Sequence, residues 1–310
     1  MPGRARTLLV ALAALATMAA CGGCGLGAGP GTRGISLTVT RDFGSRSVAS
    51  VSRDRVPGSE TMMRMLERTQ HISTRYGGGF VQSIDGLTGG GRDDWFYYVN
   101  GVQAPKGAAG TAVHAGDHIW WDLHDWSASE NVPAVVGSFP EPFVNGIAGK
   151  RYPVTVECAA NADVACKRVT AALNAVHVPA APQLLGAGSG TATLSIVVGA
   201  WSQISGDLAA ALIRSGPGTS GVYARFTDRR GDGLRLLDPA GHVARTLGAG
   251  AGLIAATADN AAVPTWLVTG TDAAGVNAAA RAFTQADLHD HFALAVDGST
   301  LLPVPLSPSS

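Results

Sequence analysis

Alternation of apolar and polar residues with a period of two runs through much of the first third of the chain, and it predicts half-buried strands there. The expected strands cover residues 35–41, 46–53, 80–84, 95–99 and 118–126. Between them, Met62, Met65 and Leu66 recur at helical spacing, after Ser59, which can cap a helix that begins at Glu60. A hairpin, one helix and further strands in this order predict a mixed sheet over a single helix.

From residue 151 onward, short apolar runs typical of buried strands alternate with segments of helical period. The expected strands are residues 152–158, 192–198, 222–227, 234–237, 243–247, 253–257, 265–269 and 292–296, and the expected helices are 164–176, 207–214 and 273–288. This pattern predicts a second domain of the α+β class. The whole chain is therefore expected to be an α+β protein with two domains.

The segment between the two domains has no sustained period and contains Pro133, Pro140, Pro142 and several glycines. Such a composition predicts a semi-rigid linker. The expected organisation is a signal peptide at 1–20, a glycine-rich tether at 21–33, a first domain at 34–127, a linker at 128–150, a second domain at 151–298 and a disordered tail at 299–310.

The first thirty residues have the features of an export signal. Arg4 and Arg6 precede the apolar stretch 7–20, which is too short to span a bilayer. Cys21 follows two alanines, close to the bacterial lipobox in which the cysteine becomes diacylated. We therefore expect Cys21 to anchor the chain to the extracytoplasmic face of the cell membrane. The alternative is plain secretion, with Cys21 free or paired with Cys24.

Charge and composition exclude some classes of protein. The 310 residues carry 23 basic and 23 acidic side chains without a run rich in lysine or arginine, which argues against nucleic-acid binding. The aromatic residues are few, with 6 Trp, 5 Tyr and 8 Phe. Seven of them lie between Trp95 and Trp126, and a functional interpretation has to account for this concentration.

The two remaining cysteines, Cys158 and Cys166, are separated by eight positions. Extracytoplasmic space permits disulfides, and this separation suits a bridge between a strand and a helix. A metal site made of cysteines alone would need more ligands. We therefore expect a disulfide between Cys158 and Cys166.

Five motifs of the first domain follow one another in a characteristic order. They are Thr40–Gly44, Tyr76–Val81, Ser83–Leu87, Asp94–Val102 and Gly116–Trp126. Together they resemble the transcobalamin C-terminal-like domain of bacterial lipoproteins, over roughly 90 residues. The resemblance implies a β-grasp domain. In the vitamin B12 carriers that name the family, a similar domain closes over cobalamin held by an all-helical domain. The second domain of this chain has mixed α and β character and resembles no family known to us.

Both faces of the predicted sheet carry aromatic rings. Alternation along strand 95–99 places Trp95 and Tyr97 on one face and Tyr98 on the other. One helix covers one face, so the second face must pack on the second domain, bind a partner or a ligand, or be exposed. Tryptophan and tyrosine also suit stacking on a flat conjugated ligand or a sugar ring. The candidate ligand-binding residues are Trp95, Tyr97, Tyr98, Trp120, Trp121, His124 and Trp126.

Polar residues in the same region predict neither a metal site nor a catalytic site. His118, Asp122 and His124 share a strand face, but their spacing is not that of a metal site, and polar groups at the rim of an aromatic surface explain them. The cluster Asp287–His291 is explained by a solvated helix end, and Thr271 or Asp272 by a helix cap. We expect no enzymatic activity.

Taken together, the residues and the resemblance predict a lipid-anchored extracytoplasmic binding protein without a covalently bound cofactor. The resemblance implies that it captures or presents a cobalamin-like cofactor, or another small ligand, to a membrane importer. The alternative is a structural module whose aromatic face docks an all-helical partner protein at the cell surface.

Overall fold

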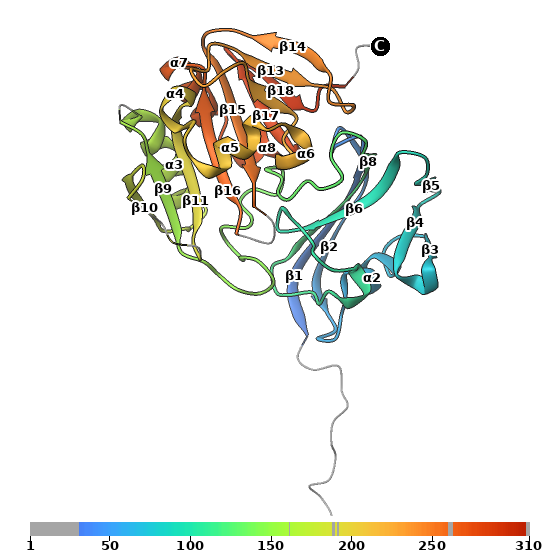
Figure 1. The fold of residues 1–310 in the computed structure, drawn as a ribbon. Helices are drawn as coiled ribbons and strands as arrows, with labels where there is room; N and C mark the ends of the chain where they lie inside the picture. Colours follow the sequence, from blue (N-terminus) through green and yellow to red (C-terminus); the bar gives the residue numbers. More distant parts are fainter. Residues whose placement is uncertain (1–30, 161, 188–189, 191, 260–262, 308–310) are drawn as a thin grey trace, which may run out of the picture.

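The computed structural model describes residues 31–307, apart from 161, 188–189, 191 and 260–262. They form two units joined by a connecting segment, and the architecture is α+β, with mixed sheets and few helices (Figure 1). The predicted signal peptide, the candidate lipid anchor Cys21 and most of the predicted tether lie outside the described residues. Within the described residues, no helix is long and apolar enough to cross a membrane.

A five-stranded sheet in the order β2-β1-β8-β6-β7 forms the first unit. Its strands are β1 (Thr32–Arg41), β2 (Arg46–Val56), β6 (Asp93–Val99), β7 (Val102–Gln103) and β8 (His118–Asp125). β1 and β2 form the predicted hairpin, and β1 pairs in parallel with β8 at the centre of the sheet. β6 pairs antiparallel with β8, so the sheet is mixed, as predicted.

One face of this sheet is covered by the short helix α2 (Met62–Glu67) and a three-stranded sheet (Figure 1). The small sheet contains β3 (Ile72–Arg75), β4 (Phe80–Ile84) and β5 (Leu87–Thr88), and two 3-10 turns, η1 (Tyr76–Gly78) and η2 (Ala108–Gly110), accompany it. Met62, Met65 and Leu66 are buried, as their spacing predicts. The cap is Thr61, whose side chain accepts the backbone N–H of Arg64 at 3.2 Å, so the predicted cap at Ser59 is wrong.

The connecting segment is more deeply buried than a linker usually is. Residues 132–143, called the strap below, contribute Val132, Val135 and Phe139 to the core. The backbone N–H of Val135 donates to Gly101 in the first unit at 2.9 Å, and that of Val136 donates to Phe292 in the second at 3.2 Å. The strap is therefore packed between the two units. Burial of its apolar side chains makes this packing favourable.

The second unit contains a seven-stranded sheet in the order β10-β9-β11-β16-β15-β17-β18. Its strands are β9 (Val154–Cys158), β10 (Ala180–Leu184), β11 (Leu194–Ala200), β15 (Ala251–Thr257), β16 (Thr265–Gly270), β17 (Ala293–Asp297) and β18 (Thr300–Val304). A small antiparallel sheet contains β12 (Ala224–Phe226), β13 (Leu234–Leu237) and β14 (Val243–Leu247).

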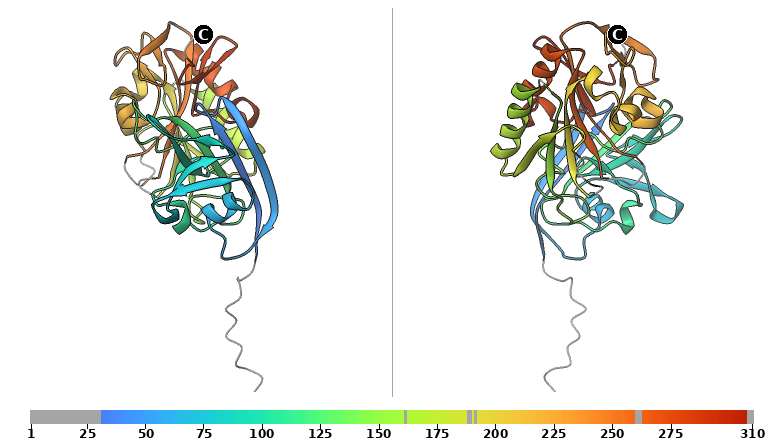
Figure 2. Two further views of the ribbon diagram at one scale, coloured as in Figure 1. Left: turned by 90° about the vertical axis from the view of Figure 1, so that its right-hand side faces the viewer. Right: turned by 60° about the vertical axis from the view of Figure 1, so that its left-hand side comes forward.

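Helices cover both faces of the seven-stranded sheet (Figure 2). On one face lie α3 (Asp163–Ala175) and α7 (Ala273–Arg281). The other helices are α4 (Trp201–Ile204), α5 (Leu208–Arg214), α6 (Pro217–Ser220) and α8 (Gln285–Leu288). Asp272 caps α7 by accepting the N–H of Gly275 at 2.9 Å, which confirms the predicted cap.

Two predictions for the C-terminal part are wrong. The helix predicted over 273–288 is interrupted, because Thr284 caps the short helix α8 and its side chain accepts the N–H of Asp287 at 3.1 Å. The predicted disordered tail contains β18, which pairs antiparallel with β17. Residues 308–310 of that tail lie outside the described residues.

The predicted disulfide between Cys158 and Cys166 is present and joins the end of β9 to α3. One core lies between the first sheet and α2. The other contains Phe43, Tyr98 and Trp120 of the first unit together with the strap and the second unit. The two units thus share a core, while the predicted domain boundaries stay a prediction.

Candidate ligand-binding site

The sheet face opposite α2 carries the second set of aromatic residues. Tyr98 on β6 lies directly opposite Trp120 on β8, and Phe96 lies opposite Asp122. Side chains alternate along a strand, so Tyr98, Trp120 and His124 share this face. Tyr97 and Trp121 lie opposite one another on the other face, with ring centroids 4.8 Å apart.

Phe292, from the loop before β17, covers the second aromatic face. Its ring centroid lies 5.1 Å from that of Phe43, 5.5 Å from Tyr98, 5.4 Å from Trp120 and 5.2 Å from His124, each pair with edge-to-face geometry. Edge-to-face pairs at such distances are favourable beyond the area that they bury. The sequence left open whether this aromatic face packs on the second unit, binds a partner or a ligand, or is exposed. The structure shows that it packs on the second unit.

Most of the predicted ligand-binding residues are therefore part of the protein interior. Five are buried, namely Trp95, Tyr98, Trp120, Trp121 and His124. The remaining two, Tyr97 and Trp126, are half-buried. The Tyr97 hydroxyl donates to the carbonyl of Lys106, and burial raises the pKa of Tyr97. As the units pack here, the five buried rings have no open face for a ligand or a helical partner. Docking of such a partner on these rings stays a prediction, and it requires the units to separate.

Asp122 is the centre of a buried hydrogen-bond network at this interface. It accepts from the Thr40 hydroxyl at 2.5 Å, from the backbone N–H groups of Phe43 and Gly44 at 3.1 and 2.9 Å, and pairs with Nδ1 of His124 at 2.8 Å. The Thr40 hydroxyl in turn accepts from Nε1 of Trp120 at 2.7 Å. These bonds fix the β1–β2 turn and hold Phe43 against the second unit.

A second polar group lies where the strap meets the first sheet. The two ring nitrogens of His118 are bonded to Thr38 at 3.1 Å and to Ser138 of the strap at 3.0 Å. Burial, with a smaller effect of nearby His289, lowers the pKa of His118 to about 4. Burial also lowers the pKa of His291 and raises that of Asp290. A neutral His118 is thus part of the packing between the units.

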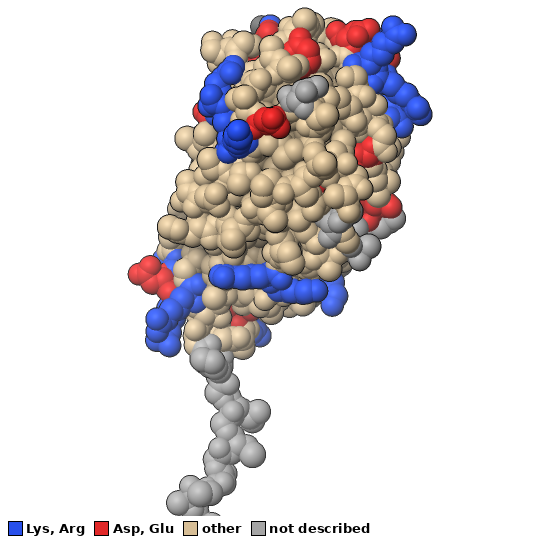
Figure 3. All heavy atoms as spheres, turned by 90° about the vertical axis from the view of Figure 1, so that its left-hand side faces the viewer, with Lys and Arg blue, Asp and Glu red and all other residues tan. Residues whose placement is uncertain are grey.

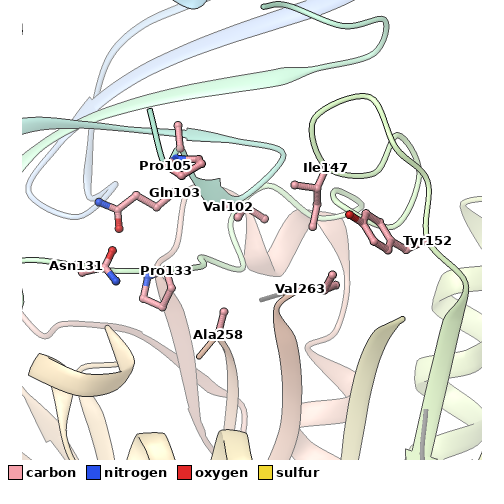
Figure 4. A pocket seen from close by; sticks show the side chains of 10 residues that line it. Val102, Gln103, Pro105, Asn131, Pro133, Ile147, Tyr152, Ala258 and Val263 are labelled. Atoms are coloured by element: carbon pink, nitrogen blue, oxygen red, sulfur yellow. The ribbon is translucent and has the colours of Figure 1, made fainter. Parts of the chain in front are cut away.

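A cleft of about 320 Å³ lies elsewhere along the contact between the units (Figure 4). Its lining comes from the first unit, the connecting segment and the second unit. The lining residues are Val102, Gln103, Ala104, Pro105, Asn131, Pro133, Ile147, Tyr152, Ala258 and Val263. None of these ten described residues is charged. Small-molecule sites are typically mostly apolar clefts of roughly 300–1,000 Å³ with a few polar groups, and they favour domain interfaces.

The β6–β7 hairpin positions one wall of the cleft. Its turn is Asn100–Gly101, both with positive φ, at 53° and 74°, as the strong hairpin signal of this dipeptide predicts. A Cβ atom on Gly101 would lie 2.9 Å from the carbonyl oxygen of Val135, so glycine also permits the close approach of the strap. The N–H of Gln103 then donates to Pro133 at 3.1 Å, which fixes Gln103 at the cleft.

Asn100 also holds the loop that carries Ile147. Its amide nitrogen donates to the carboxylate of Asp117 at 2.9 Å and to the carbonyl of Gly146 at 2.8 Å, and its amide oxygen accepts the N–H of His118 at 2.8 Å. The side chain is fully buried and bonded at both ends of its amide. A single buried asparagine therefore links the hairpin turn to the loop on the other side of the cleft.

The polar groups of the cleft lie at its two ends (Figure 4). The side chains of Gln103 and Asn131 point toward one another at one end, and Tyr152 lies with Ile147 at the other. Within the described residues, Oε1 of Gln103 has no hydrogen-bond partner. The Nζ atom of Lys150 lies 4.7 Å from the centre of the Tyr152 ring, a cation–π contact that fixes the ring.

A smaller hollow of about 70 Å³ adjoins the cleft and shares Val102–Pro105 and Ile147 with it. Its further lining residues include Met62, Val99 and Ala112. The hairpin arm at Val102–Pro105 thus has apolar space on more than one side.

Sequence reasoning missed every residue of the cleft. Its lining comes from the hairpin arm Val102–Pro105, the presumed linker, Tyr152 just after it, and Ala258 and Val263, which are more than 100 positions from the linker. The Asn100–Gly101 signal could have placed the strand Val102–Gln103, but no pattern brings Ala258 beside it.

Comparisons with known proteins place one part of the chain. Residues 59–125 match the model of a domain of unknown function, DUF4430. Among curated proteins, no sequence matches the chain. A solved structure from Ruminococcus gnavus ATCC 29149, described as a "putative metal binding protein", is similar over 30% of this chain and 97% of its own, with 21% identity and a TM-score of 0.26. Among the described residues here, no group of three or more His, Cys, Asp or Glu side chains is placed to hold a metal ion.

Proposed function

We propose that this chain is an extracytoplasmic binding protein that takes a small uncharged ligand into the cleft between its two units. One observation carries the proposal: a cleft of about 320 Å³ is built by three separate parts of the chain, and its described lining residues are apolar or neutral. Such a site combines an apolar body with a few polar groups that orient a ligand.

The uncharged lining defines the ligand class. A charged ligand in this cleft would lose hydration without gaining an opposite charge from any of the described lining residues, and that is costly. A neutral molecule with an apolar centre loses little hydration energy on entering the cleft. The side-chain amides of Gln103 and Asn131 can form hydrogen bonds with a polar group of the ligand at one end. The hydroxyl of Tyr152 is available to a second polar group at the other end.

A cobalamin-like ligand, which the resemblance of the first unit implies, is a narrower form of the proposal. The order hairpin, helix and further strands, with β1 parallel to β8, supports a β-grasp assignment for that unit. A corrinoid is much larger than a drug-sized molecule, and a volume of about 320 Å³ is at the lower end of the typical range, so the cleft favours a smaller ligand.

The proposed place of action rests on the amino-terminal sequence. We infer that Cys21 anchors the chain outside the cytoplasm and that the bound ligand is presented to a membrane importer. The proposal assigns binding and no catalysis to the cleft. The His124–Asp122 pair is buried and does not line the cleft.

Filling the cleft tests the proposal. Ala258→Trp places a large ring in the cleft, whereas Ala240→Trp makes the same change at an exposed position in the β13–β14 turn. In calorimetric titrations with a panel of uncharged amides, we expect the Ala258→Trp protein to lose binding that wild type and Ala240→Trp retain. Equal binding by all three proteins would contradict the proposal. Titration with a cobalamin in the same series tests the narrower form.

A further inference from the structure

Three arginines gather at the end of the molecule where β1 begins. Arg33 on β1 lies directly opposite Arg55 on β2, and Arg53 lies opposite Ile35, two positions along the same strand pair. All three arginines are exposed. Like charges placed directly opposite one another destabilise a sheet, so this pairing has a cost that the fold itself does not explain.

Two further basic residues lie at the same end. The carbonyl of Arg33 accepts the N–H of Gly116 at 2.9 Å, and the carbonyl of Gly116 accepts from the side-chain amide of Asn145 at 3.1 Å. The loop that begins at Asn145 leads to Lys150 and Arg151, which are both exposed. We call the set Arg33, Arg53, Arg55, Lys150 and Arg151 the basic rim.

The basic rim has little neutralising charge. In the part of the chain that the structure describes, none of its five members forms an ion pair. Asp54 contributes one exposed negative charge, and Glu141, which interacts with Arg151, is buried and bonded to Asn145. Figure 3 shows Lys and Arg side chains at this end and at the opposite end, with a broad surface of few charges between them.

We propose that the basic rim contacts the anionic headgroups of membrane phospholipids. The inference rests on the proposed anchor at Cys21. Eleven peptide steps from Cys21 to Thr32, where β1 begins, span at most roughly 40 Å, so the anchor holds this end of the molecule near the membrane surface. Juxtamembrane arginine and lysine are attracted to anionic lipid within about a Debye length of the surface. The contact orients the chain with the β1 end toward the lipid.

Vesicle binding tests the rim without the acyl chains. The probe is the mature chain from residue 21 carrying Cys21→Ser, with vesicles of phosphatidylcholine alone or mixed with an equal amount of phosphatidylglycerol. We compare it with a rim variant, Arg33→Gln, Arg53→Gln and Arg55→Gln, and with a control that loses the same charge elsewhere, Arg168→Gln, Arg229→Gln and Arg230→Gln. The control positions are exposed, and all three lie in the second unit, on α3 and in the loop before β13.

We expect the parent and control proteins to bind the anionic vesicles roughly tenfold or more tightly than the rim variant does, and to lose binding at high salt. Equal binding by the rim and control variants, or equal binding to neutral and anionic vesicles, would overturn the inference. A second variant, Lys150→Gln with Arg151→Gln, removes two rim charges from a loop. If the strand variant does not fold, this loop variant is compared with the control in the same way, and it should also bind the anionic vesicles more weakly. Ligand titration of the parent protein, the strand variant and the control variant is a separate readout, because none of their substituted arginines lines the cleft. Failure of the lipid proposal and failure of the ligand proposal can therefore be told apart.

Discussion

Two buried polar residues near the contact between the units have fixed hydrogen-bond partners, one within the first unit and one in both the first sheet and the strap. Asp122 is bonded to four groups, and His118 is bonded to Thr38 in the first sheet and to Ser138 in the strap. Burying such groups is costly unless each one has its hydrogen-bond partners. Asp122 therefore favours one conformation of the β1–β2 turn, and His118 favours one packing of the strap against the first sheet. The sequence could place His118, Asp122 and His124 on one strand face, but it could not supply their partners, because Ser138 comes from the presumed linker.

His118 makes stability depend on pH in a defined direction. Its pKa is about 4 in the folded chain and 6.5 without burial, so between these values the unfolded chain binds a proton that the folded chain does not. The stability due to a neutral His118 is complete above about pH 6.5 and is lost as pH falls toward about 4. The full loss corresponds to roughly 3 kcal/mol.

Urea unfolding of wild type and His118→Gln checks this expectation. Because other groups also titrate, the informative quantity is the difference between the two proteins, which should narrow as pH falls from about 7 to about 4.5. A difference that stays constant over this range would show that His118 is not held neutral.

At the scale of elements, periodicity predicted most of the long strands and the cores that they form. It failed for β7, which has two residues, and for β10 and β18, which contain Pro182 and Pro303. Both proline-containing strands lie at the edges of the seven-stranded sheet, where a missing backbone N–H is tolerated. Sequence reasoning that excludes strands containing proline therefore misses them. The strap was missed for a related reason, since its backbone bonds lie outside any regular element.

The disulfide between β9 and α3 should contribute to stability through the small loop that it closes. Replacing Cys158 and Cys166 together by alanine should lower the free energy of unfolding by roughly 2–3 kcal/mol, because the unfolded chain regains conformational freedom. Urea unfolding measures the change, and wild type under reducing conditions should behave like the double variant. No change in either case would mean that the bridge adds nothing to the fold.

At the scale of the whole molecule, the aromatic concentration between Trp95 and Trp126 is explained by two cores on the two faces of one sheet. The sequence predicted both faces and the helix that covers one of them. It could not decide what covers the other face, because Phe292 is almost 200 positions from Tyr98 in the chain. The cleft could not be predicted for the same reason, because its lining residues are far apart in the sequence. Contacts between units depend on how whole elements pack, and no local period encodes them.

Phe292 should be a main determinant of the packing between the units. Phe292→Ala removes a buried ring that contacts four others and should cost about 3–5 kcal/mol of unfolding free energy, whereas Phe80→Ala, at a half-buried ring in the small sheet, should cost less. Because the units share a core, wild type should unfold in one transition. Two separate transitions in wild type, or equal costs for the two variants, would contradict this account.

The most direct test of the central claim maps where an uncharged ligand binds. Nuclear magnetic resonance spectra of the mature chain are recorded with a set of uncharged amides, each paired with its carboxylate, such as benzamide with benzoate. We predict that amides shift the signals of Val102–Ala104 and Val263 in the cleft and that the carboxylates do not. Shifts confined to other parts of the chain, equal shifts by the carboxylates, or no shift by any member of the set would contradict the assignment of the cleft.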